Sequence, residues 1–256
     1  MPVEESPWAL AFALGLFFAS LTRGGIWLFH SRAKQERSTA AAYSGFPELS
    51  LQRSDYVLFF GVCLLGLVVH PLLFPIFSIL VGLWIFKIRD VSVPRLWNLS
   101  GREVGDYLAT GIDRYLLILI PLMVCAMASV AVFRLLGLEQ EPQPLVQEFL
   151  KEDNNGQVIR FLILAVVVAP IWEEVMFRGI LYPMLKSLQD RTFALISTSL
   201  LFGAIHYHGP SFIPLTFLGF VLAWTYERTG KLGYAIALHA VFNCATSIIL
   251  LLMKYA

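Results

Sequence analysis

Residues 158–185 read VIRFLILAVVVAPIWEEVMFRGILYPML, an apolar run long enough to cross a bilayer as one helix. Apart from Arg160 near its start, three charged residues interrupt this run, namely Glu173, Glu174 and Arg178. A charged side chain at mid-bilayer costs roughly 2.5–3.5 kcal/mol on insertion scales, and such residues usually mark function. The run therefore predicts a membrane span that also carries a functional site.

The rest of the chain is also apolar. Of its 256 residues 57% are hydrophobic and 14% are charged, and the mean hydropathy is +0.70. Soluble domains usually carry about 25% charged residues, so the composition predicts many spans. The net charge of +1 gives no electrostatic basis for nucleic-acid binding. Cys63, Cys125 and Cys244 lie in apolar runs without C-x-x-C spacing, which predicts neither disulfides nor a cysteine metal site.

Loop charges set the expected number of spans. Further apolar runs lie at 8–29, 56–86, 115–138, 193–207, 212–226 and 232–253. The segments 31–55 and 87–114 are both basic, so both are expected on the cytoplasmic side, and an even number of crossings must separate them. We therefore divide the 56–86 run into two short spans near His70–Pro71. The acidic 139–157 loop then lies outside, and the total is eight spans, with seven as the alternative.

A short amphipathic segment precedes the span at 115–138. Ser100 and Glu103 have the spacing of a capping box. Val104, Tyr107, Leu108 and Ile112 then fall on one helix face. This pattern predicts a separate connector helix that lies on the bilayer surface.

The three charged residues in the interior of the 158–185 run divide into an ion pair and one remaining carboxylate. Glu174 and Arg178 are four residues apart, so they share a helix face and can pair. Glu173 lies about 100° further round the helix. Pro170 interrupts the backbone ladder and frees a carbonyl. Glu173 is therefore the candidate for chemistry, unless Glu174–Arg178 is only a packing ion pair and Glu173 reaches the membrane surface.

Two later spans carry polar groups of their own. His206 follows Phe202 by four residues on an apolar run, and His208 falls at the end of that run, where we expect a loop. His239 and Asn243 share one helix face, where both need hydrogen-bond partners. A lone histidine in such a run is more often a satisfied core residue. Three such groups in three spans within 71 residues are best explained by one shared site.

The residue types fit attack of water on an amide carbonyl. A glutamate in an apolar pocket can act as a general base near neutral pH, and a neighbouring histidine can share that work. A histidine and an asparagine amide can donate hydrogen bonds to a developing oxyanion. The sequence has no H-E-x-x-H, so the common zinc-peptidase helix is not expected.

The three groups read E-E-x-x-x-R, F-x-x-x-H and H-x-x-x-N, in this order and each on its own span. This set resembles the CPBP family (CAAX protease and bacteriocin-processing enzymes) of intramembrane glutamic endopeptidases. The resemblance implies that Glu173 activates water with His206 as partner, and that Glu174 and Arg178 form the supporting pair. It places His239 and Asn243 at the oxyanion hole. His208 matches no family position.

The resemblance also implies an all-α polytopic membrane fold of eight helices, with a catalytic core at 158–253 behind a membrane-spanning region at 1–157 that has no recognised motif. It implies metal-free chemistry, so no cofactor and no metal ligand are expected. The expected partners are a protein or peptide substrate and the lipid bilayer, and the expected location is a bacterial-type inner membrane. In eukaryotic members the substrate is the prenylated CAAX tail, whereas many bacterial relatives process other peptides or membrane proteins.

Three other functions remain open on the residues alone. Glu173, His206 and His239 are also a two-histidine, one-carboxylate set for a zinc metalloprotease. Intramembrane Glu, His and Arg also build proton relays in transporters, although the chain shows no paired repeat of broken helices. The third alternative is a catalytically silent scaffold or immunity protein.

Overall fold

The computed structural model describes residues 12–23, 49–69, 73–138 and 141–255, and in these ranges all regular structure is helical. The predicted all-α class is therefore confirmed for this part of the chain. After a helix at Phe12–Arg23, the elements are α2 (Arg53–Val69), α3 (Leu73–Ile88), α4 (Val93–Trp97), the 3-10 turn η1 (Gly101–Glu103), α5 (Val104–Leu135), α6 (Pro144–Lys151), α7 (Asn155–Ile163), the π-helical turn η2 (Leu164–Val168), α8 (Ala169–Met176), the π-helical turn η3 (Phe177–Leu181), α9 (Tyr182–Leu188), α10 (Arg191–Ala204), α11 (Gly209–Thr229) and α12 (Leu232–Lys254).

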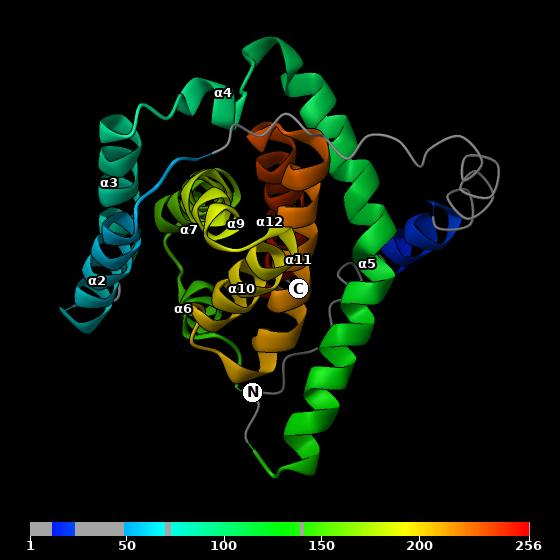
Figure 1. Ribbon diagram of the computed structural model, residues 1–256. Helices are drawn as coiled ribbons and strands as arrows, with labels where there is room; N and C mark the ends of the chain where they lie inside the picture. The colour runs from blue at the N-terminus through cyan, green and yellow to red at the C-terminus, as the bar shows by residue number, and fades with distance from the viewer. Residues whose placement is uncertain (1–11, 24–48, 70–72, 139–140, 256) are drawn as a thin grey trace.

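The C-terminal helices lie at the centre of the bundle. Figure 1 shows α2 and α3 together at one edge, α5 at the opposite edge, and α10, α11 and α12 between them. α10 packs on α11, and α5 packs on both α11 and α12. The approach of α5 to α12 is close at Gly111, where a Cβ would lie 2.9 Å from the Ala237 carbonyl carbon. The core between these layers contains the fully buried side chains of Phe177, Phe202 and Leu218.

The apolar run at 56–86 forms two helices, as predicted. α2 and α3 lie side by side, and the residues between them, 70–72, lie outside the described ranges. Two hydrogen bonds from Arg89 to Asp55, of 2.8 and 2.9 Å, join the start of α2 to the residue just after α3. These bonds hold α2 and α3 against each other at the ends away from residues 70–72.

The prediction of a separate surface helix at 100–112 is wrong. Residues 104–135 form the single helix α5, because no glycine–proline break separates Ile112 from the apolar run that follows. The capping box is also not formed, since the Ser100 side chain makes no cap hydrogen bond. The Glu103 carboxylate instead accepts hydrogen bonds from Tyr107 and from Lys231, which joins the start of α5 to the loop before α12.

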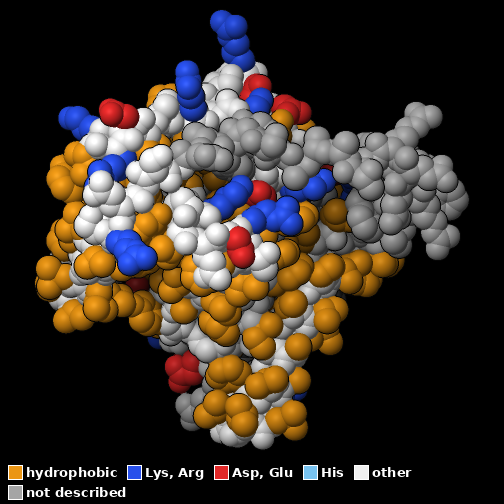
Figure 2. Space-filling model, viewed as in Figure 1, with side chains coloured by type: hydrophobic (Ala, Val, Ile, Leu, Met, Phe, Trp, Pro, Cys, Tyr) orange, Lys and Arg blue, Asp and Glu red, His pale blue; other side chains and the backbone are white. Residues whose placement is uncertain are grey.

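The surface and the helix lengths support an integral membrane protein. Among the described residues, three helical stretches are long and apolar enough to cross a bilayer, namely Val93–Leu135, α11 and α12. Shorter apolar helices cover Phe12–Arg23, Phe74–Ile88 and Arg191–Ala204. Figure 2 shows hydrophobic side chains over the sides of the molecule and most Lys and Arg toward the end where α4 lies. The expected count of eight spans is not confirmed, and the span expected at 8–29 lies partly outside the described residues.

Candidate active site

The two glutamates lie on a helix with two π-helical turns. α7, η2, α8, η3 and α9 follow one another directly, so residues 155–188 form one helical path, which we call the motif helix. Glu173 and Glu174 lie on α8, between the two π turns, and Arg178 lies in η3. π-helical turns are rare in proteins overall, but those that occur often lie at functional sites, because the extra residue changes the direction of the side chains around it.

Glu174 and Arg178 form the predicted ion pair. Arg178 Nη1 donates to Glu174 Oε1 at 2.8 Å, and both side chains have no exposed surface. Arg178 Nη2 donates to the Gly219 carbonyl of α11 at 2.7 Å, and the guanidinium lies 4.7 Å from the centre of the Phe202 ring. A buried charge is tolerated when it is paired and hydrogen-bonded, and Arg178 meets both conditions. The pair therefore joins the motif helix to α10 and α11.

His239 contacts both glutamates. Its Nδ1 lies 2.9 Å from Glu174 Oε1, and its Nε2 lies 3.9 Å from Glu173 Oε2. An ionised carboxylate only accepts hydrogen bonds, so Nδ1 carries a proton and donates to Glu174. The other nitrogen of the ring, Nε2, is thereby directed toward Glu173. The imidazole is 4% exposed, so α12 presents it from within the bundle.

Glu173 has a different environment from its neighbour. Its side chain is 22% exposed and makes no hydrogen bond within the described part of the chain. Its Oε2 is nevertheless buried and has no partner closer than the 3.9 Å contact with His239. Glu174 is fully buried, and its Oε1 accepts from both Arg178 and His239. The two adjacent carboxylates are thus separated into one that is held and one that is partly open.

The structure does not pair His206 with Glu173. His206 lies just after the end of α10, and its Nδ1 donates to the Phe202 carbonyl at 2.7 Å. Within the described ranges it forms no ion pair with Glu173. The Phe202 ring lies 5.1 Å from the His206 ring and 5.6 Å from the His239 ring, measured between centroids. The expected direct pairing is therefore absent, but both histidines lie against Phe202, because the last turn of α10 directs His206 back to its own helix end.

Asn243 contacts the motif helix near its first π turn. Its Nδ2 donates to the Ala165 carbonyl at 2.7 Å. In η2 the bonds run from residue i+5 to residue i, as Ala169 N–H to Leu164 O shows. The next donor in that series would be Pro170, which has no N–H. The carbonyl that Pro170 was expected to free is thus bonded by a side chain of α12.

Contacts among Glu173, Glu174, Arg178 and His239 therefore join four of the six predicted residues. Asn243 joins them through its bond to the motif helix, and His206 is connected to His239 only through the Phe202 ring. Sequence reasoning missed the roles of Gly219, as a carbonyl acceptor, and of Phe202, as the ring between the two histidines. His208 precedes α11, where its Nε2 donates to the Glu141 carbonyl at 2.8 Å. It belongs to a loop contact, in agreement with its omission from the predicted site.

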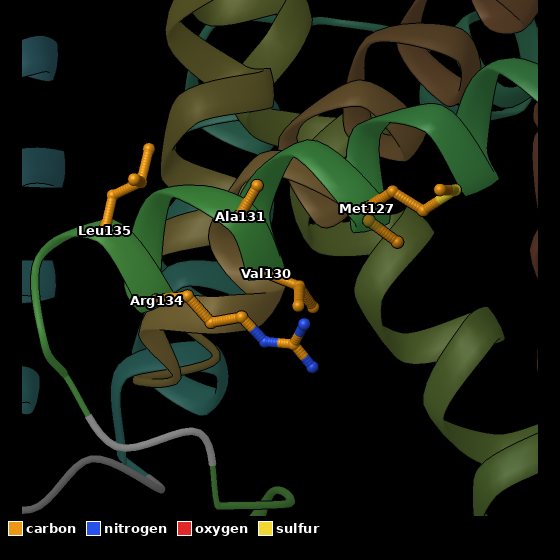
Figure 3. Close-up of a pocket in the computed structure, with 6 residues that line it drawn as sticks. Met127, Val130, Ala131, Arg134 and Leu135 are labelled. Carbon is orange, nitrogen blue, oxygen red and sulfur yellow. The ribbon is translucent and has the colours of Figure 1, made fainter.

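Two further observations bear on ligands. In the described ranges, no three His, Cys, Asp or Glu side chains are grouped closely enough to hold a metal ion. An open pocket of about 620 Å³ lies on the C-terminal half of α5, and Figure 3 shows the residues that line it. It is lined by Ala126, Met127, Val130, Ala131, Arg134 and Leu135. None of these residues belongs to the cluster around Glu173, so the pocket is distinct from the candidate site.

Comparisons with known proteins agree with this class of helical membrane protein. The family model of type II CAAX prenyl endopeptidase Rce1-like proteins matches residues 155–245. The chain is 32% identical over 101 residues to "Putative membrane peptidase YdiL" of Bacillus subtilis (strain 168), which covers 36% of this chain and 41% of that relative. The match thus spans less than half of the relative's length. No solved structure matches the chain.

The family-model match falls on the segment that holds the motif helix, α10, α11 and most of α12. The comparisons therefore support the resemblance of residues 155–245 to the CPBP family, to which the CAAX-type membrane peptidases belong.

Proposed function

We propose that this protein is an intramembrane endopeptidase in which Glu173 activates water for peptide-bond hydrolysis. The observation that carries the proposal is the unequal environment of the two adjacent glutamates. Glu174 is buried and bonded to Arg178 and His239, whereas Glu173 is partly open and its buried Oε2 has no hydrogen-bond partner within the described residues. Glu174 Oε2 also has no hydrogen-bond partner in the described residues, but its side chain is fully buried, whereas the Glu173 side chain is 22% exposed. A general base must reach the water that it deprotonates, and of the two carboxylates only Glu173 is open enough to do so.

In the proposed reaction Glu173 takes a proton from water as the water oxygen bonds to the substrate carbonyl carbon. The carbonyl oxygen becomes an oxyanion, which accepts hydrogen bonds from protonated His239 Nε2 and from the Asn243 amide. The C–N bond then breaks, and the proton held by Glu173 passes to the leaving amine. Water is consumed, and the products are a carboxylic acid and an amine.

The remaining residues support these steps. Glu174 accepts from His239 Nδ1 and stabilises the imidazolium, as a buried carboxylate does for a catalytic histidine elsewhere. Arg178 balances the charge of Glu174. Asn243 has two amide hydrogens, of which one bonds Ala165 and the second is available to substrate. His206, with Nδ1 bonded to the Phe202 carbonyl, keeps Nε2 for a proton-transfer role.

The proposed substrate is a protein or peptide that reaches the site from the bilayer, in a bacterial-type inner membrane. The relative's name specifies only a membrane peptidase, and the family name specifies a prenylated tail, which we test as one substrate class among others. The membrane proteomes of cells that carry the parent or Glu173→Gln protein should differ by accumulation of at least one uncleaved protein in the variant. Identical proteomes under conditions of equal expression would contradict the proposal.

Peptides based on the accumulated protein, with and without a prenyl group, then identify the substrate class. Cleavage by purified parent protein in detergent, and none by Glu173→Gln, is the expected result. Proton uptake into vesicles by the parent but not by Glu173→Gln, without cleavage of any peptide, would instead support a transporter.

A further inference from the structure

The motif helix contains the same arrangement twice. Pro170 lies two residues after the end of η2, and Pro183 lies two residues after the end of η3. Proline has no N–H, so each one removes a donor that the backbone carbonyls of the preceding turn would otherwise use. Near η2 the Asn243 side chain bonds such a carbonyl, that of Ala165. The second carbonyl, that of Gly179, also accepts a bond from outside the helix.

Trp97, at the end of α4, is the donor to Gly179. Its Nε1–H donates to the Gly179 carbonyl at 3.0 Å, and the two residues are 82 positions apart. The approach requires glycine, because a Cβ on Gly179 would lie 2.7 Å from Trp97 Nε1. In the i+4 register of an α-helix Pro183 would be the donor to this carbonyl, and it has no N–H, whereas in the i+5 register of η3 it would be the donor to the Arg178 carbonyl. The indole thus bonds a backbone group that lies directly next to Arg178.

The residue next to Trp97 fixes α4 in the bundle. Leu96, the residue before Trp97, is 1% exposed. Its carbonyl accepts a hydrogen bond of 2.6 Å from the Tyr226 hydroxyl of α11. α4 therefore contacts α11 and η3 together, and its position is fixed relative to both. Gly219, the α11 carbonyl that binds Arg178, is seven residues before Tyr226 on the same helix.

We propose that Trp97 is a positioning residue for the active site, acting through the second π turn. The indole fixes the Gly179 carbonyl, this sets the orientation of η3, and η3 presents Arg178 to Glu174 and to Gly219. Glu174 in turn orients His239. The proposal rests on the proposed function, because its effect on rate presupposes peptidase activity. It adds a residue from α4, outside the 155–245 segment, to the machinery.

The test is a double-variant cycle that restores the missing donor. Trp97→Phe keeps an aromatic ring and removes the N–H, and we expect kcat to fall about ten-fold with KM changed less than about two-fold, since small misplacements act on the rate of the chemical step. Pro183→Ala adds a backbone N–H four residues after Gly179. In that background the loss caused by Trp97→Phe should shrink to about two-fold or less. Trp84→Phe, at a residue that is 51% exposed on α3, is the matched control and should leave kcat unchanged.

A second readout does not need activity. In protein labelled with ¹⁵N at the indole nitrogens, the Trp97 N–H signal, assigned from its loss in Trp97→Phe, should exchange with D₂O more slowly than that of a free indole in the same detergent. Pro183→Ala should speed its exchange, because the new N–H competes for the Gly179 carbonyl.

These two readouts separate the possible failures. Equal kcat in the parent and Trp97→Phe would overturn the proposal while the proposed function stands. An equal loss of kcat on Trp97→Phe in the parent and in Pro183→Ala would also overturn it, because a change in packing alone would produce that result. If the parent and Glu173→Gln are equally inactive, the proposed function fails, and Trp97 indole exchange as fast as that of a free indole in the same detergent would then overturn the contact on its own.

Discussion

His239 Nδ1 lies 2.9 Å from Glu174 Oε1, and this contact determines how the other ring nitrogen can be used. Because Nδ1 carries a proton, Nε2 is the nitrogen available on the side of Glu173, 3.9 Å from its Oε2. One histidine thus connects the carboxylate that is paired with Arg178 to the carboxylate that we propose as the base. The predictions below separate the roles of these groups.

Glu173→Gln should abolish proteolysis while the protein remains folded and membrane-inserted. Loss of a general base typically lowers the rate by 100-fold or more, on the order of 10²–10⁴. The Glu173 side chain makes no hydrogen bond in the described residues, so the melting temperature of the variant should equal that of the parent. Cleavage of an identified substrate by purified protein provides the measurement, with Glu148→Gln on the exposed face of α6 as control. Full activity in Glu173→Gln would reject the mechanism.

Glu174→Gln should reduce stability and expression as well as activity. The change leaves Arg178 charged and fully buried without its carboxylate, and breaking such a pair costs about 3–5 kcal/mol. Melting of the detergent-purified protein measures the effect. The double variant Glu174→Gln/Arg178→Met should recover most of the lost stability and none of the activity. A single variant as stable as the parent would count against the pairing.

Asn243→Ala should lower kcat by about 10²–10³, the usual effect of removing an oxyanion donor. The same change also removes the bond to the Ala165 carbonyl. Pro170→Ala supplies a backbone N–H five residues after Ala165, so the double variant should recover stability and not rate. Recovery of kcat in Asn243→Ala/Pro170→Ala would show instead that Asn243 only holds the motif helix.

Substitutions at the two histidines should differ in their effect on protein stability more than in their effect on activity. His239→Gln should lower both, because His239 is buried and donates to Glu174. His206→Gln should lower activity alone, since His206 is half-buried and its one hydrogen bond goes to a backbone carbonyl at the end of its own helix. Melting curves and cleavage rates of the two variants, collected in parallel, make the comparison. A His206→Gln protein with parent activity would remove His206 from the site.

Activity should persist after treatment with a chelator, and purified active protein should contain less than stoichiometric metal. The basis is that Glu173, His206 and His239 are not grouped as a three-ligand set in the described residues. Elemental analysis beside an activity assay tests this prediction. Activity that is lost with the chelator and regained with zinc would establish the metalloprotease alternative.

Features that depend on local sequence were predictable. The division of 56–86 follows from the positive charge of the segments on both sides, with His70–Pro71 as the place to divide the run, and the Glu174–Arg178 pair follows from a spacing of four on one helix. The continuity of α5 was missed because a change of amphipathicity was interpreted as a helix boundary, although no residue there ends a helix.

Features that depend on tertiary packing were not predictable. Motif order alone cannot show that His239, rather than His206, lies beside Glu173, because this depends on how α10 and α12 pack around Phe202. The bond between Trp97 and Gly179 joins positions 82 residues apart, and no local pattern marks either partner. The π turns likewise become evident only when the hydrogen bonds are known.

The contacts of α4 and α5 have a consequence for engineering. α5 packs along α11 and α12, and Trp97 bonds the turn next to Arg178, so the segment that holds all three motifs depends on helices that precede it. A chimera that grafts residues 155–245 onto the N-terminal helices of another family member would break these contacts unless the host supplied an equivalent indole and a closely fitting α5. The motif-bearing segment is therefore not a transplantable module.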